Sequence, residues 1–186
     1  DNAGAIRRAS LFFVSPRQFN YLMPRFLATG PATVRITDLV GNIISSGQIE
    51  IRRVSPALFM SDPVSRTVAG TALRIKNDGT RIDEDLIQIT PDNQLAPRPI
   101  DLGEPGERIF LILFGTGVRG FIGNVTASVG GHPTDVLAAG PQIEFEGLDQ
   151  INIGPLSPLL KGQTEADIVL IVDGIQSAPV KIYFAQ

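Results

Sequence analysis

The stretch Glu107–Gly117 has the sequence ERIFLILFGTG and decides the fold of the chain. It holds six consecutive large apolar residues, Ile109 to Phe114, all of them branched or aromatic. Pro105-Gly106 precedes the run and Gly115-Thr116-Gly117 follows it. A short apolar run between residues that interrupt regular structure is typical of a strand buried on both faces. We therefore predict that a core domain forms around this strand.

Composition favours an all-β protein and argues against several classes of site. The 186 residues include 19 Gly and 14 Pro, a combined share above the usual value of about 12%. Such a high share of turn-forming residues suits a chain of many short strands and turns. There is no Cys and only one His, His132, so disulfides and thiolate metal sites are excluded and catalysis by His or Cys nearly so. No apolar run approaches the roughly 20 residues of a membrane span, and no cofactor is expected.

Charge is distributed unevenly along the chain. Residues 1–53 carry seven Arg and three acidic residues, a net +4, whereas residues 54–186 carry nine Lys or Arg and sixteen acidic residues, a net −7. The arginines are single or paired and lack a stacking aromatic platform, so solvated strand faces are favoured over nucleic-acid binding. Attraction between opposite ends of two copies is a further interpretation. The chain begins at Asp1 without Met or a signal peptide, so we expect a processed mature chain or a fragment.

Short alternating segments recur along the chain at the spacing of a β-sandwich. Between them, residues 60–100 contain a hairpin around Asn77–Thr80 and a Pro-rich linker over Pro91–Pro99. The predicted strands before and after this region are Leu11–Val14, Ala32–Thr37, Gly47–Ile51, Val125–Val129, Asp135–Ala138, Gln150–Ile153, Ile168–Val172 and Val180–Phe184. No segment has the pattern of an amphipathic helix.

The first part of the chain repeats a portion of the second. The matched segments are Ser15–Asn20 with Gly140-Pro141 and, after an insertion, Gln150–Asn152; Val34–Thr37 with Ile168–Ile171; and Ser46–Ile51 with Ala178–Tyr183. We therefore predict two immunoglobulin-like β-sandwiches in tandem, a partial one over residues 1–59 and a complete one over residues 101–186, with residues 60–100 as hairpin and linker. The first copy lacks an equivalent of Ile109–Phe114, so we expect a strand from another chain or segment to complete it.

Six sequence motifs carry a resemblance to a known family. They are VSPRQFNYLMP (Val14–Pro24), TGPATVRITD (Thr29–Asp38), SPALF (Ser55–Phe59), ILFGTGV (Ile112–Val118), VGG…VLAAGP (Val129–Pro141) and GLDQINI (Gly147–Ile153). Together they resemble the C-terminal domain of large exported proteins from Acidobacteria such as Solibacter, over nearly the whole chain after the N-terminal arm. The resemblance implies tandem immunoglobulin-like sandwiches, export to the extracellular space or cell surface, and no enzymatic activity of the domain itself. Family members carry further strands before the first copy, and this chain departs from them there.

Three groups of polar residues are candidate sites. Asn124-Val125-Thr126 is an N-glycosylation sequon, although such triplets also arise by chance. An acidic cluster near a turn consists of Asp78, Asp83, Glu84 and Asp85. Its spacing is not that of a calcium loop, so a solvated turn is the simpler interpretation. Glu144 and Glu146 alternate on one strand face and could serve glycoside hydrolysis, but neighbouring acids on a strand face usually form only its solvent-exposed side.

The leading functional hypothesis is a non-enzymatic structural module of an extracellular or cell-surface assembly. It associates head-to-tail with other copies by strand donation and can grow into a filament. The alternative is a carbohydrate- or protein-binding accessory domain from a larger secreted protein, with glycans as partners. The candidate donors are Asp1–Arg8 and Ala69–Ile75. The residues expected at the strand-exchange interface are Ala3, Ala5, Ile6, Phe12, Val14, Leu73 and Ile75.

Overall fold

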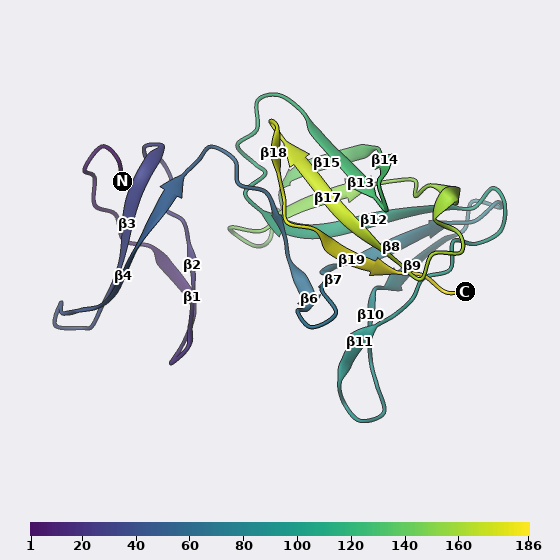
Figure 1. The fold of residues 1–186 in the computed structure, drawn as a ribbon, viewed down its shortest axis with the longest axis horizontal. Coiled ribbons are helices and arrows are strands. Elements are labelled where there is room, and N and C mark those ends of the chain that lie inside the picture. The colour runs from purple at the N-terminus through teal and green to yellow at the C-terminus, as the bar shows by residue number, and fades with distance from the viewer. The chain divides into compact units, whose positions relative to one another are not determined.

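The computed structural model describes residues 1–186 and consists almost entirely of β-strands and their connections (Figure 1). The one helical element is the short 3-10 turn η1 (Pro158–Leu160). The chain divides into two compact units, Asp1–Arg53 and Val54–Gln186, which are named unit 1 and unit 2 below. The prediction of an all-β chain is therefore confirmed. No helix in the structure has the length and apolar character needed to cross a membrane.

Unit 1 contains two antiparallel β-hairpins, each of which forms its own two-stranded sheet. Its strands are β1 (Ser10–Ser15), β2 (Gln18–Leu22), β3 (Gly30–Thr37) and β4 (Ile43–Ile51). The Ser15 hydroxyl oxygen accepts the backbone N–H of Gln18 and closes the turn between β1 and β2. The Asp38 carboxylate accepts the N–H groups of Val40 and Asn42 in the turn between β3 and β4. Side chains that bond the nearby backbone in this way stabilise tight turns.

Unit 2 is built from two larger sheets. The first has the order β15-β16-β12-β8-β9, with β5 beside one end of β12. Its strands are β5 (Ala57–Leu58), β8 (Gly70–Ile75), β9 (Arg81–Asp85), β12 (Arg108–Thr116), β15 (Val136–Pro141) and β16 (Asp149–Ile153). The second has the order β14-β13-β17-β19-β7-β6, with β18 beside β17. Its strands are β6 (Met60–Asp62), β7 (Thr67–Val68), β13 (Val125–Val129), β14 (His132–Thr134), β17 (Glu165–Val172), β18 (Ile175–Gln176) and β19 (Val180–Tyr183).

Neighbouring strands of unit 2 are antiparallel in both sheets, with one exception: β7 lies parallel to β19. A further hairpin outside the two sheets pairs β10 (Ile87–Ile89) with β11 (Leu95–Pro97). The turn of the β13-β14 hairpin is Gly130-Gly131, and both glycines have positive φ. Two-residue hairpin turns of this kind need positive φ at both positions, which glycine adopts without strain.

Strand β12 lies inside the first sheet, between β16 and β8. Ile109, Leu111 and Leu113 point into the core and are at most 2% exposed, whereas the alternate residues Phe110 and Ile112 are half-buried. The prediction of burial on both faces is therefore wrong for the outer face, because each sheet of a two-layer sandwich has only one face in the core. The inward residues of β13, β17 and β19 join the same apolar cluster. Two sheets around one core make unit 2 a β-sandwich.

The predicted domain boundaries need correction. Residues 60–100 are not a hairpin and linker outside a second domain, because they supply strands β6 to β9 of unit 2. Ala72 on β8 is fully buried in the core, directly beside β12. The residues predicted to end the first domain, Ser55–Phe59, also belong to unit 2, where β5 pairs with the end of β12. The predicted Pro-rich linker, Pro91–Pro99, lies largely within the β10-β11 hairpin, a local excursion from the sandwich.

The glycines that end the apolar run have a structural task beyond stopping the strand. Gly117 has a φ of 75°, and a Cβ at this position would overlap the Ser55 carbonyl oxygen. A Cβ at Gly115 would likewise meet the carbonyl of Ala57. The backbone N–H of Ser55 donates to the Gly117 carbonyl at 2.9 Å. The two glycines therefore let the segment that begins unit 2 lie directly against the end of β12.

Candidate functional site

Unit 1 exposes most of its large apolar side chains. Ala32 is the only buried residue of this unit. The thirteen exposed large apolar side chains are Ile6, Leu11, Phe12, Phe13, Val14, Phe19, Tyr21, Met23, Phe26, Leu39, Val40, Ile43 and Ile44. Folded proteins normally bury such residues, and large exposed apolar patches mark interaction sites. The two hairpins of unit 1 are therefore the candidate site, an interaction surface rather than a pocket.

The first hairpin of unit 1 has the same register as the β15-β16 hairpin of unit 2. Ser15 pairs with Gln18 at the turn of the first hairpin, and Gly140 pairs with Gln150 in the second. The segment match found in the sequence aligns these same residues. The repeat therefore corresponds to a shared strand register, at least for this half of unit 1.

Equivalent side chains of the two hairpins differ sharply in burial. Phe19 and Tyr21 on β2 are the counterparts of Ile151 and Ile153 on β16. Both isoleucines are fully buried, whereas both aromatic residues are 36% exposed. A side chain on the inward face of a strand becomes buried only when neighbouring strands and a facing sheet cover it. Unit 1 has the inward-facing residues but lacks this cover.

The second hairpin of unit 1 shows the same difference. Val34 on β3 is half-buried, whereas its sequence-matched counterpart Ile168 on β17 is fully buried. The sequence match needs one correction in β4. Val34 pairs with Gly47 and Ile168 pairs with Val180, so Gly47, and not Gln48, is the counterpart of Val180 on β19. The half-buried Ile49 is then the counterpart of the buried Ile182. A shift of one residue turns a side chain to the opposite face of a strand, so the alignment of this strand moves by one position.

Unit 1 also leaves strand edges without partners. In unit 2, β16 lies between β15 and β12, and β17 lies between β13 and β19. The equivalent strands β2 and β3 of unit 1 each have one neighbour only. An open edge presents unpaired backbone N–H and C=O groups and can template a further strand. The candidate site thus combines open edges on β2 and β3 with exposed apolar faces on the same strands.

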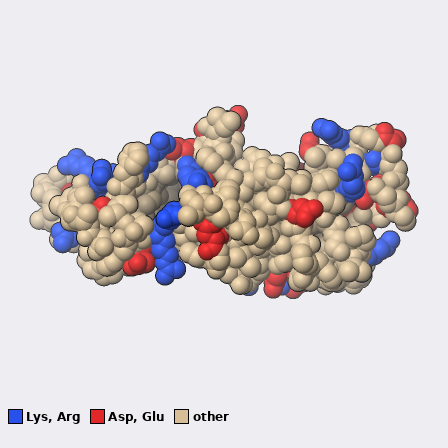
Figure 2. Space-filling view, turned by 90° about the horizontal axis from the view of Figure 1, so that it is seen from above, with Lys and Arg blue, Asp and Glu red and all other residues tan.

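Electrostatics do not dominate the surface that Figure 2 displays, which is mostly uncharged and carries acidic and basic side chains in small, separate groups. In unit 1, Arg35 lies on the exposed face of β3, whereas its neighbour Val34 lies on the opposite, half-buried face. Of the residues predicted at the exchange interface, Phe12 and Val14 are 61% and 55% exposed on β1. These exposed side chains are available to a partner.

The first candidate donor, Asp1–Arg8, is held against its own unit. The Asp1 carboxylate accepts the N–H of Ala5 at 2.9 Å and that of Ala28 at 3.0 Å. Ala28 belongs to the loop that joins the two hairpins. Ile6 is 94% exposed and Ala3 is exposed as well, so these two predicted donor side chains enter no groove of this chain, whereas Ala5 is half-buried.

The second candidate donor, Ala69–Ile75, forms β8 and is an inner strand of the first sheet of unit 2. It pairs with β12 on one side and β9 on the other. Leu73 and Ile75 share the half-buried outer face, whereas Ala72 and Arg74 face the interior. Donation of this segment to another chain requires that both neighbours first separate from it.

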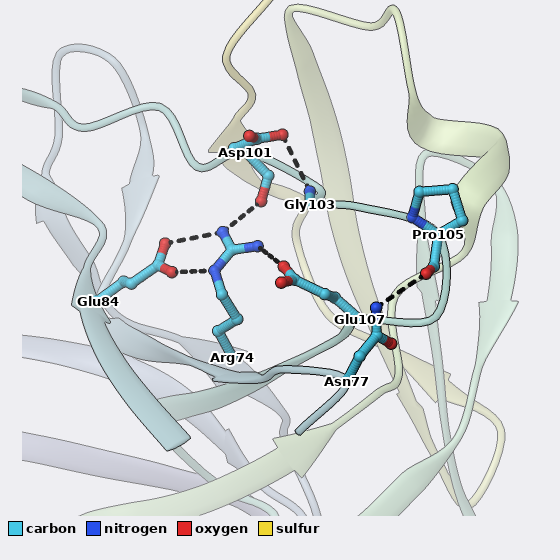
Figure 3. A network of polar contacts seen from close by, with 7 residues as sticks. All are labelled: Arg74, Asn77, Glu84, Asp101, Gly103, Pro105 and Glu107. Carbon is cyan, nitrogen blue, oxygen red and sulfur yellow. Dashed lines mark hydrogen bonds and ion pairs between the residues drawn. The ribbon is translucent and has the colours of Figure 1, made fainter. Parts of the chain in front are cut away.

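A buried ionic cluster fixes β8 in its place (Figure 3). The guanidinium of Arg74 donates to Glu84 on β9 at 2.5 Å, to Glu107 just before β12 at 3.0 Å, and to the Asp101 carbonyl oxygen at 2.7 Å. The hydrogen bond that Arg74 donates to the Glu84 carboxylate is the main cause that raises the pKa of Arg74. Because one side chain joins β8, β9 and the start of β12, the cluster explains why residues 60–100 belong to the sandwich.

The acidic residues predicted to cluster near the hairpin turn bind different partners. Asp78 accepts the N–H of Thr80 at 2.9 Å, and this backbone hydrogen bond lowers the pKa of the Asp78 carboxyl. Glu84 is engaged by Arg74. The structure gathers no group of three or more His, Asp or Glu side chains suited to a metal ion.

The remaining candidate residues lie apart from one another. Asn124 is exposed immediately before β13, so the sequon is accessible. Glu144 and Glu146 are exposed in the loop between β15 and β16, not on a strand face as predicted, because Gln142 closes a turn there by accepting the N–H of Glu144. His132 is the first residue of β14. The structure brings none of these residues together into one site.

Buried polar groups inside unit 2 are satisfied. Asp149 is fully buried and accepts the N–H of Val118 at 2.9 Å and the Nε–H of Arg119 at 2.7 Å. No buried side-chain nitrogen or oxygen in the chain lacks a hydrogen-bond partner. The exposed strands of unit 1 are therefore the most conspicuous unsatisfied feature of the molecule.

Comparison with protein families, with characterised proteins and with solved structures gave no match to this chain.

Proposed function

We propose that the chain is a non-enzymatic structural module of an extracellular or cell-surface assembly and that it self-associates through unit 1. One contrast carries the proposal: equivalent inward side chains are buried in unit 2 and exposed in unit 1. Added strands satisfy both needs of unit 1, because their main chain pairs with the open edges and their side chains cover the apolar faces. The extracellular or surface location rests on the resemblance of the sequence motifs alone.

Both units are immunoglobulin-like in this proposal. The arrangement of unit 2 supports it, since β15-β16-β12 face β14-β13-β17-β19, and β7 lies parallel to the last strand. Immunoglobulin sandwiches have this pattern of two antiparallel sheets with consecutive central strands on opposite sheets. Unit 1 then represents the last four strands of such a sandwich.

Head-to-tail strand donation is one geometry of this self-association. The net charges of +4 on residues 1–53 and −7 on residues 54–186 favour it. It also requires Asp1–Arg8 or Ala69–Ile75 to leave the contacts described above. A contact of this kind does not close on itself and can extend into a filament.

Sedimentation velocity tests self-association directly. The full chain and residues 54–186 are compared over the same concentration series. We expect the full chain to form larger species as its concentration rises, whereas residues 54–186 stay monomeric because they lack the exposed strands. A full chain that stays monomeric at the highest concentrations contradicts the proposal. Association of both proteins to the same extent contradicts the role of unit 1.

One observation favours the alternative, an accessory domain that binds glycans or proteins. A shallow groove lies along β15 and the following loop, lined by residues 138–144 and Gln150. Ile143 in this lining is exposed, and so is Phe145, which follows the lining residues in the chain. An exposed aromatic ring next to polar groups suits stacking against a sugar. Titration of glycans against the chain and its Phe145→Ala variant tests this alternative. Absence of binding to the natural chain rejects glycan binding, and equal binding by both proteins rejects this groove as the site.

A further inference from the structure

The central strands of unit 2 repeat one arrangement twice. Strand β12 of the first sheet is followed along the chain by β13 of the second, and β16 of the first sheet is followed by β17 of the second. Strand β12 is antiparallel to β16, and β13 is antiparallel to β17. A rotation by half a turn about an axis through both sheets therefore exchanges the pair β12-β13 with the pair β16-β17.

The strands next to this centre follow the same rule. In the first sheet, β8 lies beside β12 as β15 lies beside β16. In the second sheet, β14 lies beside β13 as β19 lies beside β17. All four of these pairs are antiparallel. One half of the sandwich, β15-β16 with β17-β19, thus has nearly the strand layout of the other half.

Unit 1 contains strands equivalent to that one half: β1-β2 match β15-β16, and β3-β4 match β17-β19. We propose that the other half is supplied by unit 1 of a second copy, so that two chains share one sandwich with a two-fold axis. This inference rests on the self-association proposed above and specifies its geometry. Strand β2 pairs with β2 of the second copy, and β3 pairs with β3 of the second copy. Such a contact is isologous and closes at a dimer.

Several two-fold registers keep the apolar residues inward, and the proposed one is centred on Asn20 of β2 and Val34 of β3. On β2, Asn20 lies at the axis and Phe19 of one copy pairs with Tyr21 of the other. On β3, Val34 lies at the axis and Ala32 of one copy pairs with Ile36 of the other. On β3 the paired residues belong to the less exposed face of the strand. On β2 they are the counterparts of Ile151 and Ile153, which pair with the buried Leu113 and Leu111 of β12 in unit 2. The axis thus places each set of inward side chains against its own equivalent.

A second copy of unit 1 fits better than the two donor segments of the chain. The arm at Asp1 is bonded to its own unit, and β8 is paired on both sides. In a second copy, β2 and β3 of unit 1 also have an open edge and an exposed apolar face, so no strand has to leave its partners before association. The outward Arg35 pairs across the axis with the uncharged Thr33 in this register, so no arginines are opposed directly on β3.

Disulfide trapping tests the axis, since the natural chain has no Cys. We expect the single variants Asn20→Cys and Val34→Cys to form disulfide-linked dimers under mild oxidation. Residues directly opposite on antiparallel strands are about 4.5–5.5 Å apart at Cα, within the range of a disulfide. Gln48→Cys on the exposed face of β4 is the matched control and should remain largely uncrosslinked.

The outcomes separate the geometry from the self-association itself. Crosslinking at positions 20 and 34 but not at 48 supports the shared sandwich. Association of the full chain in sedimentation without crosslinking at positions 20 and 34 overturns the two-fold pairing and leaves the proposed function standing. A chain that neither associates nor crosslinks overturns both. Equal crosslinking at all three positions shows random collision and also overturns the pairing.

Salt dependence gives an independent readout of the same geometry. Two copies of unit 1 both carry a net positive charge, so added salt screens their repulsion and should strengthen or preserve the dimer. Head-to-tail association between the positive and negative parts of two chains should weaken as salt rises. A dimer that dissociates on moving from low to high salt therefore overturns the shared sandwich in favour of the head-to-tail form.

Discussion

Units 1 and 2 contain matched hairpins whose equivalent side chains differ in burial. Phe19 and Ile151 stand at the same place in hairpins of the same register, yet one is 36% exposed and the other is fully buried. Both hairpins have suitable turns and inward apolar residues. The difference comes from their neighbours, because β16 has β12 beside it and a second sheet opposite. A hairpin sequence thus determines which side chains face inward, but not whether anything lies there to cover them.

The largest effect is expected from moving the start of unit 2. Residues 54–186 should unfold cooperatively, whereas residues 101–186 should fail to fold. The shorter piece loses β5 to β9 and with them the neighbour of β12 and the buried Ala72. Circular dichroism and urea denaturation check this expectation. A cooperative transition in residues 101–186 contradicts the boundary at Val54 and restores the one inferred from sequence.

Substitution at the matched positions sharpens the comparison between the units. Ile151→Ala should destabilise residues 54–186 by about 2–5 kcal/mol, since it removes a fully buried side chain and leaves a cavity. Phe19→Ala in the full chain should leave the unfolding transition of unit 2 unchanged and weaken self-association. Urea denaturation and sedimentation velocity measure the two effects. Comparable loss of unit 2 stability from both changes is incompatible with the division into units.

The ionic cluster offers a test of how firmly β8 belongs to unit 2. Arg74→Met leaves Glu84 and Glu107 without their cation, and we expect a loss of about 3 kcal/mol, the lower end for buried pairs because Glu84 keeps some solvent access. The control is Lys181→Met, which breaks the surface pairs with Glu165 and Asp167 and should cost less than about 1 kcal/mol. Equal effects in urea denaturation refute a structural role for the cluster.

The smallest effect concerns acid sensitivity at the turn between β6 and β7. The hydroxyl of Ser65 and the N–H of Val64 donate to Asp62, and the Ser65 bond is the main cause that lowers the pKa of its carboxyl. A carboxyl whose pKa is lowered in the folded state stabilises the fold at pH values above its unfolded-state pKa of about 3.9. This stabilisation is lost as the pH falls through the folded-state pKa. Asp62→Asn should therefore lose slightly less stability than the natural chain between neutral and acidic pH. A larger loss in the variant, measured by urea midpoints, argues against this contribution.

Sequence reasoning identified the elements that local pattern controls. The apolar run of β12, the hairpin turns and the repeat between the two parts of the chain all follow from residue type and spacing. It identified the hairpin around Asn77–Thr80 but placed it outside the second domain, because no local pattern shows that Ala72 and Arg74 are buried beside β12. It placed Glu144 and Glu146 on a strand, whereas Gln142 starts a loop there. The open edges of unit 1 were foreseen only through the missing counterpart of β12.

The sequence by itself determined the all-β class, the strand candidates and the inward face of most strands, because side-chain alternation and turn residues act over a few positions. Only the tertiary structure decided which strands lie beside one another. Residues 54–100 join the sandwich through β8, which pairs with β12 across about 40 residues of chain, and through Arg74, which contacts groups from three segments. Such contacts depend on chain-wide packing, which no local pattern encodes, and the same packing leaves β2 and β3 of unit 1 with open edges.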